Sequence, residues 1–522
     1  MRSRNGGWLG GCPNNLIPMG DRLIFPGLSI LATIFLLLFL LFSAKRWSQI
    51  MDDRHKNYRA WDPQEGSQKR VSPQEVLPED DLVFFLLDLL PKMDLSAFHQ
   101  YYAGELRGQP PFDVTMMVTL LVYGYCLGIR SSRKITMACE RNLGFRAIVG
   151  DDPPDFRTIS DFRKIHLAAF ENLFVEVLRV AGELGMVKLG NLSTDGTKMG
   201  ANASRHKAMS YGYMNKEIDR LRAEVKELLR QAEQLDVEQD ATLGSRRDDE
   251  LPEELKRRTQ RLAKIEEAKA RLESEAAARA AEEQHRRDAA QAEREAEGRK
   301  RRGKEPSPVD STPEAKAQTN FTDPQSKVMK QSNKGFDYSY NAQAVVDGQD
   351  QIIVAPKVTD QANDKQQAVP MAQAALNNLS AAGIAIPQDA HGNPQRIPNT
   401  ADNGYFSEKA VEGLEKMGLD PHIATGRQKH HEGPLPPETT EQSAEGSVEE
   451  KMRQKLRSVV GKTLYAARKS IVEPVFGQIK GVRGIRNFLL RGLEKVSAEW
   501  NLICLTHNLL KIWRRSISVG VI

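Results

Sequence analysis

The chain has 522 residues, which is long enough for several domains, and 40% of them are hydrophobic, which is ample for a buried core. The net charge of +5 is mild, so charge alone does not indicate a partner. No two cysteines have zinc-ligand or redox spacing, which excludes a cysteine-based metal or redox site and predicts buried thiols in a reducing cytoplasm. The cysteines are Cys12, Cys126, Cys139 and Cys504.

An apolar run at residues 23–44 is long enough to span a bilayer, and Lys45 and Arg46 flank it. Taken alone, it predicts a membrane anchor or an uncleaved signal. A polar stretch that resembles an ordinary cytosolic start begins at Met51. We therefore interpret residues 1–50 as a spurious, membrane-like extension that follows an upstream start codon. A membrane-anchored protein is the alternative, and it depends on this run alone.

Residues 51–186 are predicted to form a helical N-terminal domain. A capped amphipathic helix begins near Glu79, and further helices are expected at 115–127, from Ser131 to Cys139, and at 158–184. Six cations of this domain could contact phosphates, and a helix-turn-helix is possible. They are Arg130, Arg133, Lys134, Arg157, Arg163 and Lys164. A structural or dimer-forming bundle fits the pattern equally well.

A predicted strand ends in a carboxylate. Residues 187–195 read VKLGNLSTD, in which Val187 and Leu189 alternate with polar neighbours. Asp195 ends the run and Gly196 follows, a common way to present a carboxylate from a rigid element. A lone Asp-Gly pair is also typical of a turn, so this segment alone does not distinguish a functional carboxylate from a turn residue.

Residues 213–302 are predicted to interrupt the core as an inserted helical hairpin. Apolar residues repeat with coiled-coil spacing on both sides of Gly244 and Pro252. They are Ile218, Leu221, Val225, Leu228, Ala232 and Leu235, then Leu255, Leu262, Ile265, Leu272 and Ala276. Pairing of this coiled coil between subunits is the alternative. A disordered linker is expected at 303–318, which is rich in proline and serine.

The core is predicted to occupy residues 187–212 and 319–513. Strands at 338–347 and 351–359 should pair around Gly348, and a helix should follow from Asp364, delayed by Pro370.

A further strand should end at Asp402 and lie beside the strand that carries Asp195. Asn403-Gly404 marks a turn after it, and Ser407 has the character of a helix N-cap. The order of strands and helices predicts a mixed sheet flanked by helices.

Glu473 and Lys480 are seven residues apart, close to two helical turns, and would share one helical face. Val472, Phe476 and Ile479 form a core stripe beside that face. A carboxylate next to a core stripe needs a cation, and a divalent metal would also support chemistry. An amphipathic helix with a solvent-facing glutamate is the alternative.

Positive charge is concentrated near Glu473. Residues 451–515 hold fifteen Lys or Arg against three acids, Glu473, Glu494 and Glu499. This distribution predicts a phosphate-binding surface, with a solvated basic face as the alternative.

Six segments in this order, between residues 59 and 513, resemble the DDE transposases of bacterial insertion sequences. They are YYAGELRGQPPFDVTMMVTLLVYGYCLGIRSSRKI near residue 101, TDGTKMGANAS around Asp195, NFTDPQSKVMKQSNKGFDYSYNAQAVVD near residue 320, ADNGYFSE around Asp402, IATGRQKH near residue 423, and VEPVFGQIKGVRGIRNFLLRGLEKVSAEWNLICLTHNLLKIW around Glu473.

The resemblance implies an RNase H-like α/β core with Asp195, Asp402 and Glu473 as the catalytic, metal-binding carboxylates. They would hold two Mg²⁺ ions, for which Mn²⁺ would substitute, because phosphodiester chemistry needs the attacking oxygen activated and the leaving oxygen neutralised. Asn341 and Asn320 would lie near the site.

The resemblance also implies a spaced signature around the glutamate, for which Tyr465, Arg468, Glu473 and Lys480 have the matching types. The gap from Arg468 to Glu473 is one residue longer than in the best-known version of the signature, so Lys469 could take the cationic role. The expected DNA contacts are Lys480, Arg468, Lys469, Arg483, Arg486 and Lys198, and the helix of Glu473 is expected to continue through Arg491.

The implied function is transposition, with metal-dependent cleavage at element ends and 3′-hydroxyl strand transfer into target DNA. The expected partners are terminal inverted repeats and target DNA, bound by a homodimer in the cytoplasm at the nucleoid, and no membrane partner is expected. A nuclease of the same fold and a catalytically silent DNA-binding protein are the alternatives, and the intact acidic triad argues against the second.

Overall fold

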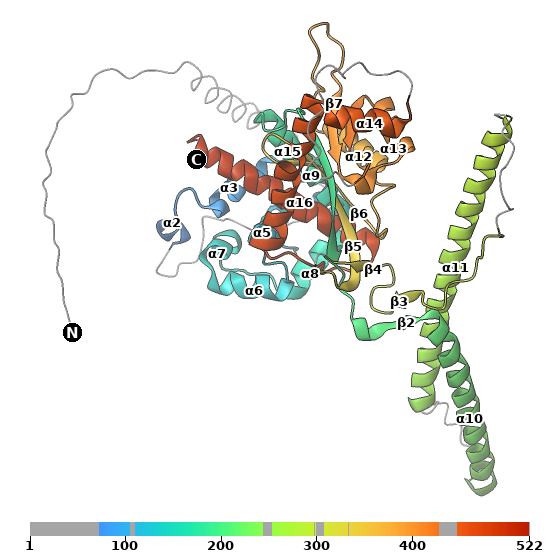
Figure 1. Ribbon diagram of the computed structural model, residues 1–522. Coiled ribbons are helices and arrows are strands. Elements are labelled where there is room, and N and C mark those ends of the chain that lie inside the picture. Colours follow the sequence, from blue (N-terminus) through green and yellow to red (C-terminus); the bar gives the residue numbers. More distant parts are fainter. Residues whose placement is uncertain are drawn as a thin grey trace, which may run out of the picture. The chain divides into compact units, whose positions relative to one another are not determined.

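The computed structural model describes residues 72–104, 110–243, 253–296, 298, 307–331, 333–426 and 446–520 (Figure 1). The interpreted extension at 1–50 and its apolar run at 23–44 lie outside these ranges. None of the helices within them is both long and apolar enough to cross a bilayer.

The N-terminal segment is helical, as the sequence predicts. Asp81 caps the predicted amphipathic helix by accepting a hydrogen bond from Val83 N at 2.9 Å. The helix expected at 158–184 is two helices, which meet at His166. The segment comprises α2 (Pro73–Val76), α3 (Leu82–Leu89), α4 (Ser96–His99), α5 (Val114–Cys126), α6 (Ser132–Arg141), α7 (Leu143–Val149), α8 (Phe156–Ile165) and α9 (Leu167–Glu183).

A mixed six-stranded sheet forms the centre of the α/β core. Its order is β4-β5-β1-β7-β8, with β6 also paired to β5. Only the β1–β7 and β7–β8 pairs are parallel. The strands are β1 (Leu192–Gly200), β4 (Lys327–Lys330), β5 (Phe336–Asp347), β6 (Ile353–Thr359), β7 (Ile397–Ala401) and β8 (Leu419–Ile423).

The strand that carries Asp195 begins later and runs further than predicted. It spans Leu192–Gly200, so Asp195 lies within the strand and not at its end. Pairing explains the difference, because β5 matches β1 along its whole length whereas β7 matches it only as far as Thr194. Asp195 therefore lies where one neighbouring strand stops and the other continues.

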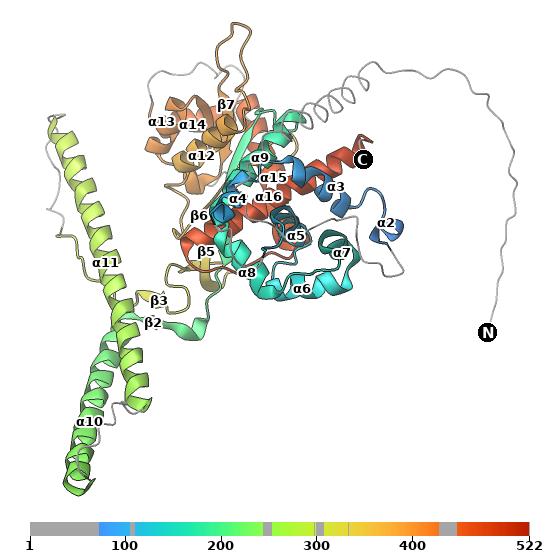
Figure 2. The ribbon, with the colours of Figure 1, turned by 180° about the vertical axis from the view of Figure 1, so that it is seen from behind.

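Helices cover both faces of the sheet. α15 (Val459–Gly477) contacts β1, β5, β7 and β8, and α16 (Leu493–Ser518) packs on β6, α5 and α9 (Figure 1). α13 (Glu408–Lys416) and α14 (Val448–Arg457) pack on β8, and α12 (Ala368–Ala381) packs on β5, β6 and α13 (Figure 2). Asn508 of α16 bonds both N and O of Ile353, which satisfies backbone groups of β6.

The inserted helical hairpin is present. α10 (Tyr211–Leu243) and α11 (Glu253–Ala296) pack together through Ile218 and Leu221 on one helix and Ile265 and Leu272 on the other. Strands β2 (Ala208–Ser210) and β3 (Gln318–Asn320) pair at its base. Of the linker expected to be disordered, residues 307–318 have defined contacts, including a hydrogen bond from Tyr211 N to Ala317 O, and 303–306 lie outside the described ranges.

A buried group that we call the Glu499 network joins the N-terminal helices to the C-terminal segment. Glu499 on α16 is 1% exposed, pairs with Arg130 Nη1 at 2.9 Å, and accepts from the backbone N of Leu489 and Leu490. Arg163 donates to the carbonyl of Arg130 at 2.9 Å. One carboxylate thus fixes a loop of the core against the N-terminal segment.

This network corrects the predicted phosphate contacts of the N-terminal segment. Arg130 and Arg163 are 7% and 6% exposed, so they are structural groups. Arg133, Lys134 and Arg157 are exposed, as a phosphate contact requires. The three described cysteines, Cys126, Cys139 and Cys504, are buried free thiols, as expected.

Removal of the Glu499 carboxylate should destabilise the fold strongly. We expect Glu499→Ala to lower the free energy of unfolding by about 3–5 kcal/mol, because Arg130 would remain buried without a counterion. Denaturant titration followed by tryptophan fluorescence measures the change. Glu494→Ala, at an exposed position of the same helix, is the matched control. Its free energy of unfolding should stay within about 1 kcal/mol of the parent value. Equal losses in the two variants would contradict the role of the network.

Candidate active site

Asp195 and Asp402 lie side by side in the sheet. Thr194 and Ala401 are the last pair of the parallel β1–β7 ladder, and each aspartate directly follows its member of that pair. Burial raises the pKa of Asp195 to about 6, an effect that Arg468 opposes and the charge of Asp402 reinforces. The predicted neighbourhood of these two carboxylates is therefore present, and their charges are close enough to repel.

Glycine is required directly after Asp195. A Cβ at Gly196 would lie 2.3 Å from Gln343 Nε2 and 2.9 Å from Asn341 Oδ1. Both distances are shorter than real contacts, so the backbone of β1 can approach β5 here only without a side chain.

Asp402 begins a turn of 3₁₀-helix, and its Oδ1 accepts a hydrogen bond from Gly404 N at 2.8 Å. Ser407 then caps α13, as predicted, by accepting from Ala410 N at 3.1 Å. Two successive caps therefore set the path of the chain after β7.

Arg468 is a partner of Asp195 rather than a DNA contact. It is 8% exposed on α15, and its Nη1 lies 3.2 Å from Asp195 Oδ2. The sequence predicted Arg468 as a DNA contact, and burial corrects this. Lys469 is exposed at the next position and stays a predicted DNA contact.

Lys480 donates to Thr197 Oγ1 at 2.5 Å and to the carbonyl of Lys198 at 2.7 Å. It lies in a π-turn, Gln478–Val482, that follows α15. Burial, with Arg486 and Lys198 nearby, lowers the pKa of Lys480 to about 8. Because a π-turn has more residues per turn than an α-helix, the predicted two-turn relation between Glu473 and Lys480 does not hold strictly.

Glu473 is not brought to the two aspartates by any contact of the described residues. Its side chain is exposed on α15 and makes no hydrogen bond or ion pair there. Within the described ranges, no three His, Cys, Asp or Glu side chains are arranged to hold a metal ion. The structure thus brings together two of the three predicted carboxylates, and the third stays a prediction.

Asp364 is a carboxylate that the sequence did not single out, and its charge acts on Asp195. It lies just before α12, and its Oδ1 accepts from Asn341 Nδ2 and Gln343 Nε2, each at 2.6 Å. Lys198, predicted to contact DNA, has its Nζ 3.6 Å from the same oxygen. Asn341 was expected near the site and is there. Asn320 instead binds the carbonyl of Ser204, at the base of the hairpin.

The segment after the π-turn is a loop and not the predicted continuation of the helix. Arg483 is 8% exposed and donates to Thr506 Oγ1 at 2.8 Å, so it is a structural group and not a DNA contact. Arg486 and Arg491 are exposed. Hydrogen bonds from Gly200 N to Arg486 O and from Phe488 N to Gly200 O tie this loop to the end of β1.

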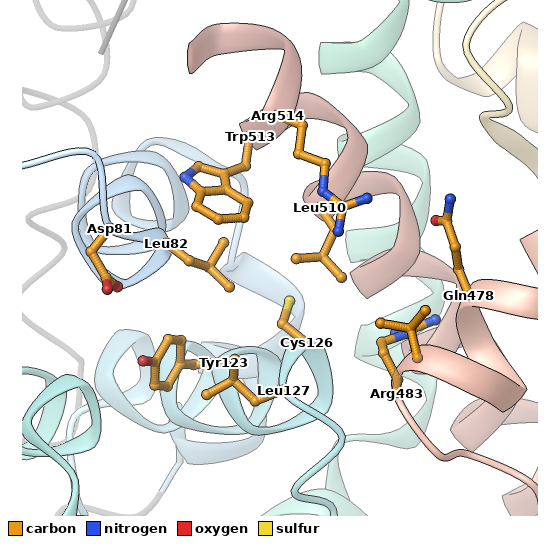
Figure 3. Close-up of a pocket in the computed structure, with 11 residues that line it drawn as sticks. Asp81, Leu82, Tyr123, Cys126, Leu127, Gln478, Arg483, Leu510, Trp513 and Arg514 are labelled. Atoms are coloured by element: carbon orange, nitrogen blue, oxygen red, sulfur yellow. The ribbon is translucent and has the colours of Figure 1, made fainter. Parts of the chain in front are cut away.

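A cavity of about 270 Å³ lies elsewhere, between α3, α5 and the C-terminal segment (Figure 3). Leu82, Tyr123, Leu510 and Trp513 line it, and among its described lining residues Asp81 is the one acid. Such a lining does not suit phosphodiester chemistry, so the acidic cluster remains the candidate site.

Two segments of the chain match transposase family models. Residues 71–165 match a Transposase domain (DUF772), and residues 437–513 match a Transposase DDE domain. The second match includes Arg468, Glu473 and Lys480. Searches of curated proteins and of solved structures find no match.

The raised pKa of Asp195 predicts a pH-dependent stability difference. The native carboxyl of Asp195 keeps its proton up to about pH 6, whereas the unfolded chain releases it near pH 4. The contribution of Asp195 to the free energy of unfolding is therefore fully present below pH 4, and it is lost as pH rises through about 6. In metal-free buffer, the free energy of unfolding of the Asp195→Asn variant should exceed that of the parent by up to about 3 kcal/mol above pH 6. The two values should match below pH 4. Denaturant titration across pH measures this, with Glu494→Gln, at an exposed position of α16, as the matched control. A constant difference across pH would contradict the assignment.

Proposed function

We propose that this chain is a DDE transposase of the insertion-sequence type, and that its acidic cluster cleaves DNA at element ends and joins the 3′-hydroxyl to target DNA. The observation that carries this proposal is the position of Asp195 and Asp402 on adjacent parallel strands. Glu473 is the proposed third carboxylate, on the helix that packs against those strands.

The strand order supports an RNase H-like core. The long β5 lies antiparallel to β1, and β7 lies parallel on its other side. This is the mixed sheet that the sequence resemblance implies, with an aspartate after each member of the last β1–β7 pair. The transposase domain at 71–165 would supply end recognition through its exposed cations.

The residues present fit a divalent cation. Asp195 and Asp402 offer hard carboxylate oxygens, and the raised pKa of Asp195 shows that its anion lacks full compensation. Two Mg²⁺ ions, replaceable by Mn²⁺, would supply nucleophile activation and neutralise the leaving oxygen. Glu473 is exposed on α15, the helix that packs on β1 and β7, and is the proposed third ligand.

The chain's own groups would bind and orient the DNA. Lys480 is held by Thr197 Oγ1 and the backbone of β1, so its ammonium group is fixed at the residues of β1 that follow Asp195 and Gly196. Arg468 fixes one oxygen of Asp195. Arg486 and Arg491 are exposed on the loop tied to β1, where phosphates can reach them.

The transposase domains imply DNA binding, and we propose that the substrates are double-stranded terminal inverted repeats and target DNA, bound by a homodimer. A nuclease of this fold would cleave and never join, and a silent derivative would bind only. The cytoplasm, where nucleoid DNA lies, is the proposed location.

Strand transfer with Mg²⁺ tests the proposed chemistry. Purified protein should nick terminal-repeat DNA and join it to a target plasmid. Asp195→Asn, Asp402→Asn and Glu473→Gln should each lose both steps while retaining DNA binding, because each removes one charge from the cluster. Glu408→Gln changes an exposed carboxylate of α13 and should retain full activity. Cleavage without joining would indicate the nuclease, and an active Asp195→Asn variant would refute the site.

Substitutions of the basic loop separate DNA binding from chemistry. Lys480→Ala should lower cleavage by about 100-fold beyond its effect on binding, because the ammonium is held on the strand that carries Asp195. Arg486→Ala and Arg491→Ala should weaken binding alone and each lower the salt slope by roughly one. Filter binding across salt concentrations, beside single-turnover cleavage, measures both quantities. An unchanged salt slope in the Arg486→Ala, Arg491→Ala double variant would place the DNA elsewhere.

A further inference from the structure

An aromatic ring and a lysine are exposed together at one end of the sheet. Phe336, the first residue of β5, is 63% exposed, and Val328 on the neighbouring β4 is 43% exposed. The register pairs Phe336 with the exposed Lys330, and paired residues of an antiparallel ladder lie on one face. We call this segment, which comprises β4 and residues 336–339 of β5, the Phe336 ribbon. Its surface fits a partner that has both apolar and anionic parts.

The turn that joins the two strands of the ribbon has a fixed shape. Gln331 N donates to Gly335 O at 2.7 Å, and Lys334 N donates to Gln331 O at 3.0 Å. Gln331 Nε2 also donates to Ser339 Oγ at 2.7 Å. Lys334 is exposed and has a φ of 65°, in the left-handed region that favours glycine. Residues held in such conformations cluster at functional sites, so the lysine points to a role for this turn.

The face of the sheet that carries Phe336 also carries Asp195. Asp195 pairs with Ala344 in the β1–β5 ladder. Because paired side chains lie on one face and side chains alternate along a strand, Ala344, Tyr340 and Phe336 share the face of Asp195. Phe336 is eight positions from Ala344, which is about 26 Å along an extended strand. The ribbon is therefore a second feature of the same face, at a defined distance from the candidate site.

Cations lie on this face between the candidate site and the ribbon. Lys480 is held on β1 by the residues that follow the first aspartate and its glycine. The loop of the exposed Arg486 and Arg491 comes next, because the ring of its Phe488 packs edge-on against Tyr340 with centroids 6.1 Å apart. An anionic polymer that starts at the aspartates would therefore meet positive charge along its whole path to the ribbon.

The ribbon itself has a positive balance of charge. Its acid, Asp337, is paired with Arg205, whose Nε and Nη2 donate to the two carboxylate oxygens at 2.9 and 2.7 Å. Lys330 and Lys334 are exposed beside this ion pair. The charge of the ribbon complements a phosphate backbone, and its phenyl ring complements the interior of a groove.

We propose that the Phe336 ribbon docks in the major groove of the element-end DNA, about eight base pairs from the phosphate that is cleaved, since B-DNA rises about 3.4 Å per base pair. The major groove admits a two-stranded β-ribbon. Lys330 and Lys334 bind phosphates at the edges of the groove, and Phe336 makes apolar contact with base edges inside it. The inference rests on the proposed function and deepens it, because it assigns a second DNA contact to the face of the proposed active site.

Substitutions separate the charged contacts from the apolar contact. Filter binding of the full chain to terminal-repeat duplexes, across salt concentrations, measures affinity and salt slope without any catalytic step. The Lys330→Ala, Lys334→Ala double variant should lower the salt slope by roughly two, because two phosphate contacts are lost. Phe336→Ala should weaken binding by about 10-fold at an unchanged salt slope, because burial of a phenyl ring releases no counterions. Lys416→Ala on α13 and Ile386→Ala after α12, both at exposed positions, are the matched controls and should change neither quantity.

The length of the duplex tests the position of the ribbon on the DNA. The loss of affinity in Phe336→Ala should appear with duplexes that extend more than about eight base pairs from the scissile phosphate. Shorter duplexes should bind the parent and the variant equally, because they end before the ribbon. An equal loss with short and long duplexes would overturn the assigned spacing.

The outcomes separate this proposal from the proposed function. If the parent binds and cleaves terminal-repeat DNA and the ribbon variants match it in affinity and salt slope, this inference fails alone. If Phe336→Ala leaves DNA affinity unchanged but lowers the oligomeric state in sedimentation, the ribbon contacts a second copy of the chain and the inference also fails. If the parent neither binds nor cleaves this DNA, both proposals fail.

Discussion

The parallel pairing of β1 with β7 is the constraint on which the candidate site depends. It ends at Thr194 and Ala401, so Asp195 and Asp402 emerge next to each other despite a separation of 207 positions in the sequence. Like charges at this separation repel, and burial adds to the penalty. The fold tolerates them because Arg468 pairs with one aspartate and a backbone N–H of the 3₁₀-turn binds the other.

Positive charge around the cluster is divided between two roles. Arg130, Arg163, Arg468 and Arg483 are buried and hold segments together, whereas Arg486 and Arg491 remain on the surface. The Glu499 network connects the buried arginines with the surface arginines. It fixes the loop that carries the surface arginines against the N-terminal segment that matches a transposase domain. The proposed DNA-end recognition and the proposed chemistry would then be carried by segments that this network connects.

The sequence predicted those features of the fold that local residue patterns encode. The hairpin seam, the Ser407 cap and the strand beside Asp195 all follow from periodicity or turn chemistry, and the structure contains them. The burial of Arg468 and Arg483 could not be read from charge, because it depends on distant partners. The loop after Lys480 did have a signal in the sequence, since Gly484 adopts a φ of 66°, a conformation that ends a helix. The contacts of Asp364 could not be predicted from the sequence, because its partners lie on β5, some twenty residues away.

Iron-mediated backbone cleavage tests the central claim most directly. Fe²⁺ in place of Mg²⁺, with peroxide and a reductant, cuts a chain next to the bound ion. The account predicts cuts near residues 195 and 402, competed by Mg²⁺ and lost in the Asp195→Asn variant. Cuts confined to other segments, or cuts that persist in that variant, would show that these aspartates do not form a metal site.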